Sequence, residues 1–170
     1  MDSEIPTQPP SVKLTWNDVD RIHRNLAAII SAENFAPEFI VAISRGGLVT
    51  ATHLAYLLSV KNIISISIRR PILKSTVEHS LSFPEYIGQA GDIDLLNGQR
   101  VLIVDGAIGT GRTIRKAVSV VSSCNPKEIR VAIMATWADC PGSKNALADC
   151  TSRYYLGETY YPWPIFPWEN

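Results

Sequence analysis

The chain has 170 residues, 46% of them hydrophobic, and its 16 Lys and Arg balance 16 Asp and Glu. This length suits a single domain that buries roughly 70% of its unfolded surface, so it needs no metal or disulfide to stay folded. The composition excludes intrinsic disorder, and zero formal charge argues against a nucleic-acid binder that works by bulk electrostatics. The composition and the zero net charge are both compatible with a local basic pocket for a small anion.

The N-terminal residues, the cysteines and the length of the apolar runs indicate a cytoplasmic protein without a membrane partner. Cys124, Cys140 and Cys150 form no CxxC pair and offer neither a zinc site nor a disulfide framework, so we expect reduced thiols in a cytoplasmic protein. Residues 1–11 are polar and contain three prolines, which predicts a flexible arm before one domain over 12–170. No apolar run approaches the roughly 20 residues that cross a bilayer, so we expect no membrane partner.

Helical and strand patterns alternate along the chain. Thr15 followed by Asp18 is typical of a capped helix start. Helical spacing of apolar residues covers 16–34, 48–59 and 112–123. Short runs typical of strands cover 39–43, 64–68, 101–104, 129–135 and 154–156. This alternation predicts an α/β fold with an open, mainly parallel sheet and flanking helices.

Two segments break this alternation. Residues 71–98 contain several prolines and glycines but no long periodic pattern, which predicts a long loop of the kind that often acts as a lid. Residues 161–170 contain three prolines and two tryptophans, and they are too apolar for a free tail. We therefore expect the C-terminal residues to fold back over the domain.

The strongest chemical signal begins where the strand 101–104 ends. Asp105 follows that strand, and a turn rich in Gly and Thr leads to a helix that starts at Arg112. In open α/β sheets, ligands bind outside the carboxyl ends of the strands. Gly109 and Gly111 let a ligand approach the backbone, and the free N–H groups of the helix start favour an anion. The run lacks the GxxxxGK[ST] spacing of a Walker loop.

These residues resemble the signature of the type I phosphoribosyltransferases, which is an apolar strand, two acidic residues, a short turn and Thr-Gly-x-Thr. Residues 101–105 and 110–113 match it. Segment 43–49 resembles the diphosphate loop of the family, and segment 163–169 resembles its C-terminal base-binding segment. The resemblance is closest to the xanthine-guanine and hypoxanthine-type purine enzymes.

The resemblance implies a fold, a reaction and partners. The fold would be the Rossmann-like sheet of that family, with a hood over 71–98 and a base-binding segment over 157–170. The reaction would transfer the 5-phosphoribosyl group between phosphoribosyl diphosphate (PRPP) and a nucleobase, most readily a purine. The products would be a nucleoside 5′-monophosphate and diphosphate. Mg²⁺ would be the cofactor, and the protein would be a homodimer or homotetramer.

The resemblance also implies roles for individual residues. Asp105 would hold the ribose hydroxyls and Mg²⁺, and Asp105 and Arg45 would be the catalytic residues. The 5′-phosphate would lie against Gly109, Thr110, Gly111, Arg112 and Thr113. The diphosphate would meet Ser44, Arg45, Gly46, Gly47 and Arg69. The base would meet Trp163, Ile165, Thr136 and Trp137.

Three positions depart from the family pattern. Gly106 stands where the family has its second acid, Gly109 stands where xanthine-guanine enzymes have a proposed catalytic base, and Thr136 replaces a lysine that reads the purine. A non-catalytic PRPP- or nucleotide-binding protein on the same fold is therefore the alternative hypothesis. Adenine, a pyrimidine or a non-standard base also stay open. For His23 and His53 we expect structural roles.

Overall fold

The computed structural model describes residues 11–69, 84–138, 153–161 and 163–169. Their strands are β1 (Ser11–Lys13), β2 (Phe39–Ser44), β3 (Asn62–Arg69), β4 (Glu85–Ala90), β5 (Arg100–Ile108), β6 (Glu128–Trp137), β7 (Tyr154–Tyr160) and β8 (Trp163–Ile165). The helices are α1 (Trp16–Ala32), α2 (Gly46–Leu57) and α4 (Arg112–Ser122), with the short 3-10 helices η1 (Ile93–Leu96) and η3 (Pro167–Glu169). No helix of the described residues has the length and apolar character of a membrane span.

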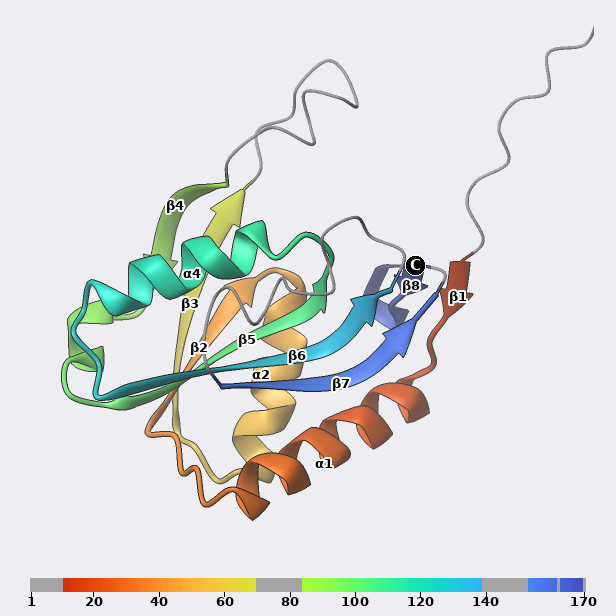
Figure 1. The fold of residues 1–170 in the computed structure, drawn as a ribbon, viewed down its shortest axis with the longest axis horizontal. Coiled ribbons are helices and arrows are strands. Elements are labelled where there is room, and N and C mark those ends of the chain that lie inside the picture. The colour runs from red at the N-terminus through yellow and green to blue at the C-terminus, as the bar shows by residue number, and fades with distance from the viewer. Residues whose placement is uncertain (1–10, 70–83, 139–152, 162, 170) are drawn as a thin grey trace, which may run out of the picture.

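Six strands form one sheet in the order β4-β3-β2-β5-β6-β7 (Figure 1). All neighbours are parallel except β3 and β4, so the predicted mainly parallel α/β fold is confirmed. Alternate residues of β2, such as Val41 and Ala42, belong to two separate hydrophobic clusters. One cluster packs under α1 and α2 and the other under α4, which places helices on both faces of the sheet.

Two expectations about the strands need correction. β5 does not end at Val104 but continues to Ile108, because Ala107 and Ile108 pair with Ala135 and Thr136 of β6. Part of the segment 71–98 is regular structure, since β4 lies within it and pairs antiparallel with β3. Residues 70–83, which are most of the predicted hood, lie outside the described residues.

The two ends of the described chain meet in a small second sheet. β1 pairs in parallel with β8, and the Leu14 amide donates to the Ile165 carbonyl at 2.9 Å. Phe166, which follows β8, is buried in the cluster under α1 and α2. The C-terminal residues thus pack against the domain, as their apolar composition predicts.

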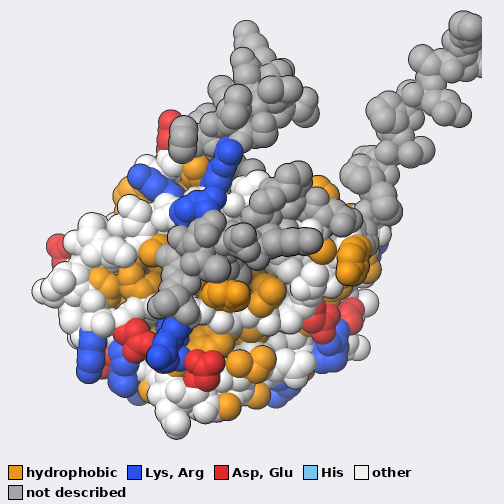
Figure 2. All heavy atoms as spheres, viewed as in Figure 1, with side chains coloured by type: hydrophobic (Ala, Val, Ile, Leu, Met, Phe, Trp, Pro, Cys, Tyr) orange, Lys and Arg blue, Asp and Glu red, His pale blue; other side chains and the backbone are white. Residues whose placement is uncertain are grey.

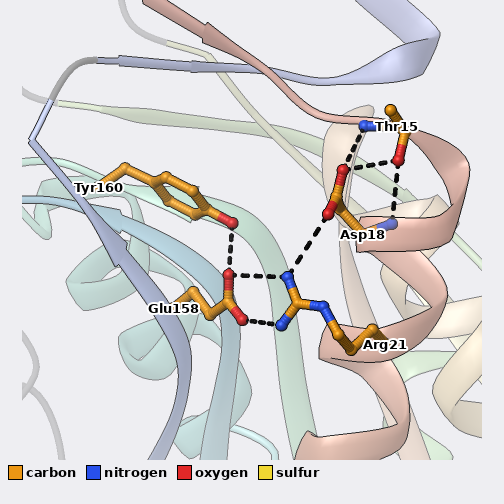
Figure 3. Close-up of polar contacts among 5 residues, drawn as sticks. All are labelled: Thr15, Asp18, Arg21, Glu158 and Tyr160. Atoms are coloured by element: carbon orange, nitrogen blue, oxygen red, sulfur yellow. Dashed lines mark hydrogen bonds and ion pairs between the residues drawn. The ribbon is translucent and has the colours of Figure 1, made fainter.

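A polar network fixes α1 against β7 (Figure 3). Thr15 and Asp18 form the predicted cap, in which the Asp18 amide donates to the Thr15 hydroxyl and the Thr15 amide donates to the Asp18 carboxylate. Arg21, one turn further along α1, forms a two-pronged ion pair with Glu158 of β7. Glu158 also accepts a hydrogen bond from the Tyr160 hydroxyl at 2.6 Å. This network holds the end of β7, which leads directly into the C-terminal segment.

Candidate active site at the carboxyl ends of β2 and β5

The sheet has a topological switch point between β2 and β5. From β2 the chain passes to β3 on one side, whereas β5 and its successors lie on the other. Crevices at such points, outside the carboxyl ends of the strands, are where open α/β sheets bind ligands. Both sequence motifs lie here, because Ser44 ends β2, Arg45 follows it, and Asp105 lies near the end of β5.

The turn after β2 is pressed against β5. The Ser44–Arg45 peptide bond is cis, and α2 begins directly afterwards, at Gly46 rather than at the expected Leu48. A Cβ atom on Gly47 would lie 2.6 Å from the Val104 carbonyl oxygen and 3.1 Å from the Asp105 Cα, so only glycine fits this close approach. The predicted diphosphate turn therefore lies directly against β5 at Asp105.

The turn after β5 forms a pocket with a cavity volume of about 150 Å³, which we call the β5–α4 pocket. Its walls are Asp105, Ala107, Ile108, Gly109, Thr110, Gly111, Arg112, Thr113, Ile114, Trp137 and Trp163. Gly111 has φ 72°, a left-handed conformation that favours glycine, and it stands at the start of α4. The backbone N–H groups at the start of α4 and the hydroxyls of Thr110 and Thr113 suit a phosphate group.

Among the described residues that line this pocket, Asp105 is the single carboxylate. Its Oδ1 accepts a hydrogen bond of 2.7 Å from the Gly106 amide. Burial of the carboxyl raises the pKa of Asp105 to about 7, and the Gly106 hydrogen bond offsets only part of that effect. A carboxyl with such a pKa exchanges its proton near neutral pH, as expected of functional groups in enclosed sites.

Two tryptophans form the opposite part of the pocket. The rings of Trp137 and Trp163 meet edge to face, with centroids 5.7 Å apart. The Trp137 indole N–H donates to the Tyr161 carbonyl at 2.8 Å, which ties β6 to the turn before β8. An aromatic face next to a phosphate-binding loop is a suitable surface for a nucleobase.

Seven predicted site residues are not among the described residues that line this pocket, namely Ser44, Arg45, Gly46, Gly47, Arg69, Thr136 and Ile165. Thr136 is almost fully buried in β6, and the Ile165 carbonyl already accepts the Leu14 hydrogen bond. Arg69 ends β3, and Arg45 and Arg112 follow β2 and β5, so all three cations lie along the same edge of the sheet. Figure 2 shows Lys and Arg side chains gathered over the end of β3 and the start of α4.

A larger groove, about 610 Å³ in volume, lies between α1 and α2. Its walls include the apolar side chains of Trp16, Leu48 and Tyr56, and its ionisable groups are Asp20 and His53. Asp20 already holds Arg24 and His53, and the described residues that line the groove include no glycine. The smaller pocket is thus better suited to a phosphorylated ligand.

His23 and His53 take the structural places expected of them. His23 is fully buried on α1, with its Nδ1 3.0 Å from the Nδ1 of His53 and its Nε2 3.2 Å from the Thr50 hydroxyl. Both histidines lie between α1 and α2, away from the β5–α4 pocket. The sequence pattern does not single out Trp168, whose ring lies 3.8 Å from a Cβ atom built on Gly106.

Known proteins are similar to this chain in sequence and in fold. Xanthine-guanine phosphoribosyltransferase of Gluconobacter oxydans is 28% identical over 168 residues, which cover 99% of this chain and 90% of that protein. The crystal structure of a purine phosphoribosyltransferase from Pyrococcus horikoshii matches with a TM-score of 0.72 and 27% identity over 94% of each chain.

A third protein shows the fold alone. It is a hypothetical protein from Neisseria gonorrhoeae with bound ppGpp, and it matches with a TM-score of 0.77 at 19% identity, over 96% of this chain and 92% of that one. The model of the phosphoribosyl transferase domain matches residues 15–158. That range includes the cap of α1, both turns at the switch point and most of the sheet, so the chain belongs to the phosphoribosyltransferase family, a family of transferase enzymes.

Proposed function

We propose that this chain transfers the 5-phosphoribosyl group between PRPP and a purine base. The bond from the ribose C1 to a diphosphate oxygen would break, and a bond from C1 to a purine nitrogen would form as that nitrogen loses its proton. The observation that carries this proposal is the β5–α4 pocket, which combines an anion-binding turn, one carboxylate and two indole rings. The named functions of the Gluconobacter and Pyrococcus relatives favour a purine.

Each part of the pocket has a place in this reaction. The amides and hydroxyls of residues 109–113 would bind the 5′-phosphate, and the ring of Trp163 would stack on the base. Asp105 would accept hydrogen bonds from the ribose hydroxyls. Arg45 and the amides of Gly46 and Gly47 would hold the diphosphate, whose negative charge grows as the glycosidic bond breaks.

The donor set of the pocket fits Mg²⁺. This ion prefers oxygen ligands, keeps several waters and is usually held by one or two carboxylates together with substrate phosphates. Asp105 supplies one carboxylate, and the described residues contain no cluster of three or more His, Cys, Asp or Glu side chains able to hold a metal on its own. Asp105 would therefore hold Mg²⁺ jointly with oxygens of PRPP. The bound ion supplies positive charge next to the leaving diphosphate.

A second candidate is a PRPP- or nucleotide-binding protein without transferase activity. Gly106 and Gly109 favour it, because neither supplies the carboxylate that the family pattern has there. Under either proposal we expect a cytoplasmic homodimer or homotetramer, in line with the family resemblance and the free thiol of Cys124.

Diphosphate release separates the two candidates. The protein is incubated with PRPP, Mg²⁺ and, in turn, xanthine, guanine, hypoxanthine, adenine and uracil. Release of diphosphate with at least one purine, together with formation of the matching nucleoside monophosphate, is the expected result. Tight binding of nucleoside monophosphates without diphosphate release from any base would reject the transferase and support the binding protein.

A further inference from the structure

Three segments of the site meet at Gly106. A Cβ atom built on Gly106 would lie 3.5 Å from the carbonyl carbon and oxygen of Gly46, and 3.8 Å from Cζ2 of Trp168. Gly46 begins α2 within the predicted diphosphate turn (44–47), Gly106 follows Asp105 in β5, and Trp168 belongs to η3 within the predicted base-binding segment (163–169). Both neighbours are at ordinary contact distance, so a methyl group fits while a larger side chain meets either the loop or the indole.

Trp168 is itself held firmly in place. Its ring stacks on Phe166 with centroids 4.8 Å apart and planes 6° from parallel, and Trp16 of α1 contacts it at 5.8 Å. The turn that carries it is closed twice, since the Phe166 amide donates to the Glu169 carboxylate and the Glu169 amide donates to the Phe166 carbonyl. The indole is therefore a fixed wall beside Gly106 rather than a free surface side chain.

The segment that carries Trp168 also carries Trp163, which lines the β5–α4 pocket together with Asp105. The turn that contains Gly46 also contains Gly47, which presses on the backbone of Val104 and Asp105. Gly46 and Trp168 thus lie on the same face of β5, the face toward which a Cβ atom of Gly106 would point.

We propose that Trp168 is a positioning residue that sets the spacing between the diphosphate turn and the base-binding segment. The inference rests on the proposed function, because it assigns these two segments to PRPP and to the base. It also accounts for a small residue at position 106, since the indole and the Gly46 backbone leave no room for a side chain larger than a methyl group. Loss of the indole loosens the diphosphate turn and the base-binding segment together. It therefore weakens the binding of PRPP and of the base, although no group that touches the reacting atoms is removed.

Steady-state kinetics with the most active base test this role in Trp168→Ala and Trp168→Phe. We expect Trp168→Ala to raise the KM for PRPP and the KM for the base about tenfold each while kcat changes less than threefold, the pattern of lost ground-state binding. Trp168→Phe keeps an aromatic wall and should stay within threefold of the wild type. Tyr154→Ala, an exposed aromatic at the amino end of β7, is the control.

Gly106→Val changes the other residue of the Gly106–Trp168 contact. It keeps the test valid if Trp168→Ala does not fold. Its branched side chain pushes on Trp168 and Gly46, so the same joint rise of both KM values is expected. Unchanged KM values in either variant, or a loss confined to kcat or to thermal stability, would overturn the positioning role.

Binding measurements distinguish this inference from the proposed function. If the wild type releases no diphosphate, calorimetry with PRPP and Mg²⁺ and, separately, with GMP replaces the kinetics. Trp168→Ala should then bind PRPP and GMP about tenfold more weakly than Tyr154→Ala does. Equal affinities of the two variants for these ligands would overturn the inference. A wild type that binds neither ligand would overturn both proposals.

Discussion

Gly47 of α2 packs directly against Val104 of β5, so closely that a Cβ atom on Gly47 would lie 2.6 Å from the Val104 carbonyl oxygen. Both of the atoms nearest to this Cβ position belong to the backbone, since the next nearest is the Asp105 Cα at 3.1 Å. Backbone atoms of a central strand do not yield as the tip of a side chain does. This contact fixes the distance between the diphosphate turn and the carboxylate of the site.

Gly47→Ala should therefore separate α2 from β5 and destabilise the protein. Overpacking of this kind costs about 1–3 kcal/mol, and we expect a loss in that range in urea unfolding. Gly46→Ala is the matched control for stability, because in the described part of the chain no atom beyond its chain neighbours and its own helix backbone lies within 4 Å of a Cβ built on Gly46. Equal midpoints for the two variants would contradict the close approach of α2 to β5.

Asp105→Asn should make the protein more stable at alkaline pH while abolishing transfer. The pKa of Asp105 is about 7 in the folded protein and close to 3.8 in the unfolded chain, so the folded state favours the protonated form. Stability from this group is complete below pH 3.8 and is lost as the pH rises through 7. The asparagine does not ionise, and at pH 8 we expect a gain of about 1–3 kcal/mol.

Urea midpoints of the wild type and Asp105→Asn at pH 4, 6 and 8 check this prediction. The midpoints should lie close together at pH 4 and move apart as the pH rises. Diphosphate release at pH 8 measures the accompanying loss of function, which is a common cost of stabilising a functional site. A constant difference between the midpoints at all three pH values would rule out titration of Asp105 as the cause.

The two tryptophans of the pocket should respond differently to substitution. Trp163→Ala removes the ring proposed to stack on the base, and stacking of a base on an aromatic ring is worth about 1–3 kcal/mol, so we expect a loss of affinity for GMP of about 5- to 150-fold. Trp137→Phe keeps an aromatic ring but loses the indole hydrogen bond to the Tyr161 carbonyl. Calorimetry should show a smaller loss for Trp137→Phe, and the reverse order would transfer the stacking role to Trp137.

The sequence predicts those features that depend on neighbouring residues. The cap at Thr15 and Asp18 needs only three residues of helix to form, and the β2 core strand is a continuous apolar run. The glycine at 111 takes the positive φ that a tight turn into α4 requires. These local signals predict the mainly parallel α/β fold and the glycine turn into α4.

Features that depend on distant residues could not be predicted in the same way. Asp105 and Gly106 look like a turn, yet β5 continues through them because β6 lies alongside and supplies its hydrogen-bonding partner. β4 contains Gly88 and has no clear alternation, and it forms because it pairs with the edge of β3. Trp168 reaches Gly106 only after the chain end has returned to the sheet, so no spacing in the sequence reveals that contact.

Glu158→Gln should weaken the attachment of α1 to β7 in a pH-dependent way. The Arg21 guanidinium is the main cause of a lowered pKa for Glu158, which therefore contributes stability above the ordinary glutamate pKa of 4.5 and loses it as the pH falls. Glu158→Gln should lower the thermal midpoint at pH 7 and have little effect at pH 3.5. Glu85→Gln, on the exposed strand β4, is the control for removal of a carboxylate.

His23 makes the protein sensitive to acid. Burial, together with the charge of nearby His53, lowers the pKa of His23 to about 4, and Asp20 offsets part of this effect. The unfolded chain takes up this proton near pH 6.5, so stability from His23 is complete above pH 6.5 and is lost as the pH falls through 4, by about 2–3 kcal/mol.

His23→Gln keeps a donor and an acceptor beside Thr50 and His53 but cannot be protonated. The variant should be less stable than the wild type at pH 7.5, by about 1 kcal/mol for imperfect hydrogen bonds. That difference should shrink and then reverse as the pH falls to 4.5. Only the wild type has the buried imidazole, which gains a proton on unfolding and so lowers the free energy of unfolding in acid. Urea midpoints at pH 7.5, 6.5, 5.5 and 4.5 measure it, and since Asp105 titrates alike in both proteins, parallel curves would exclude His23 as the source of the acid sensitivity.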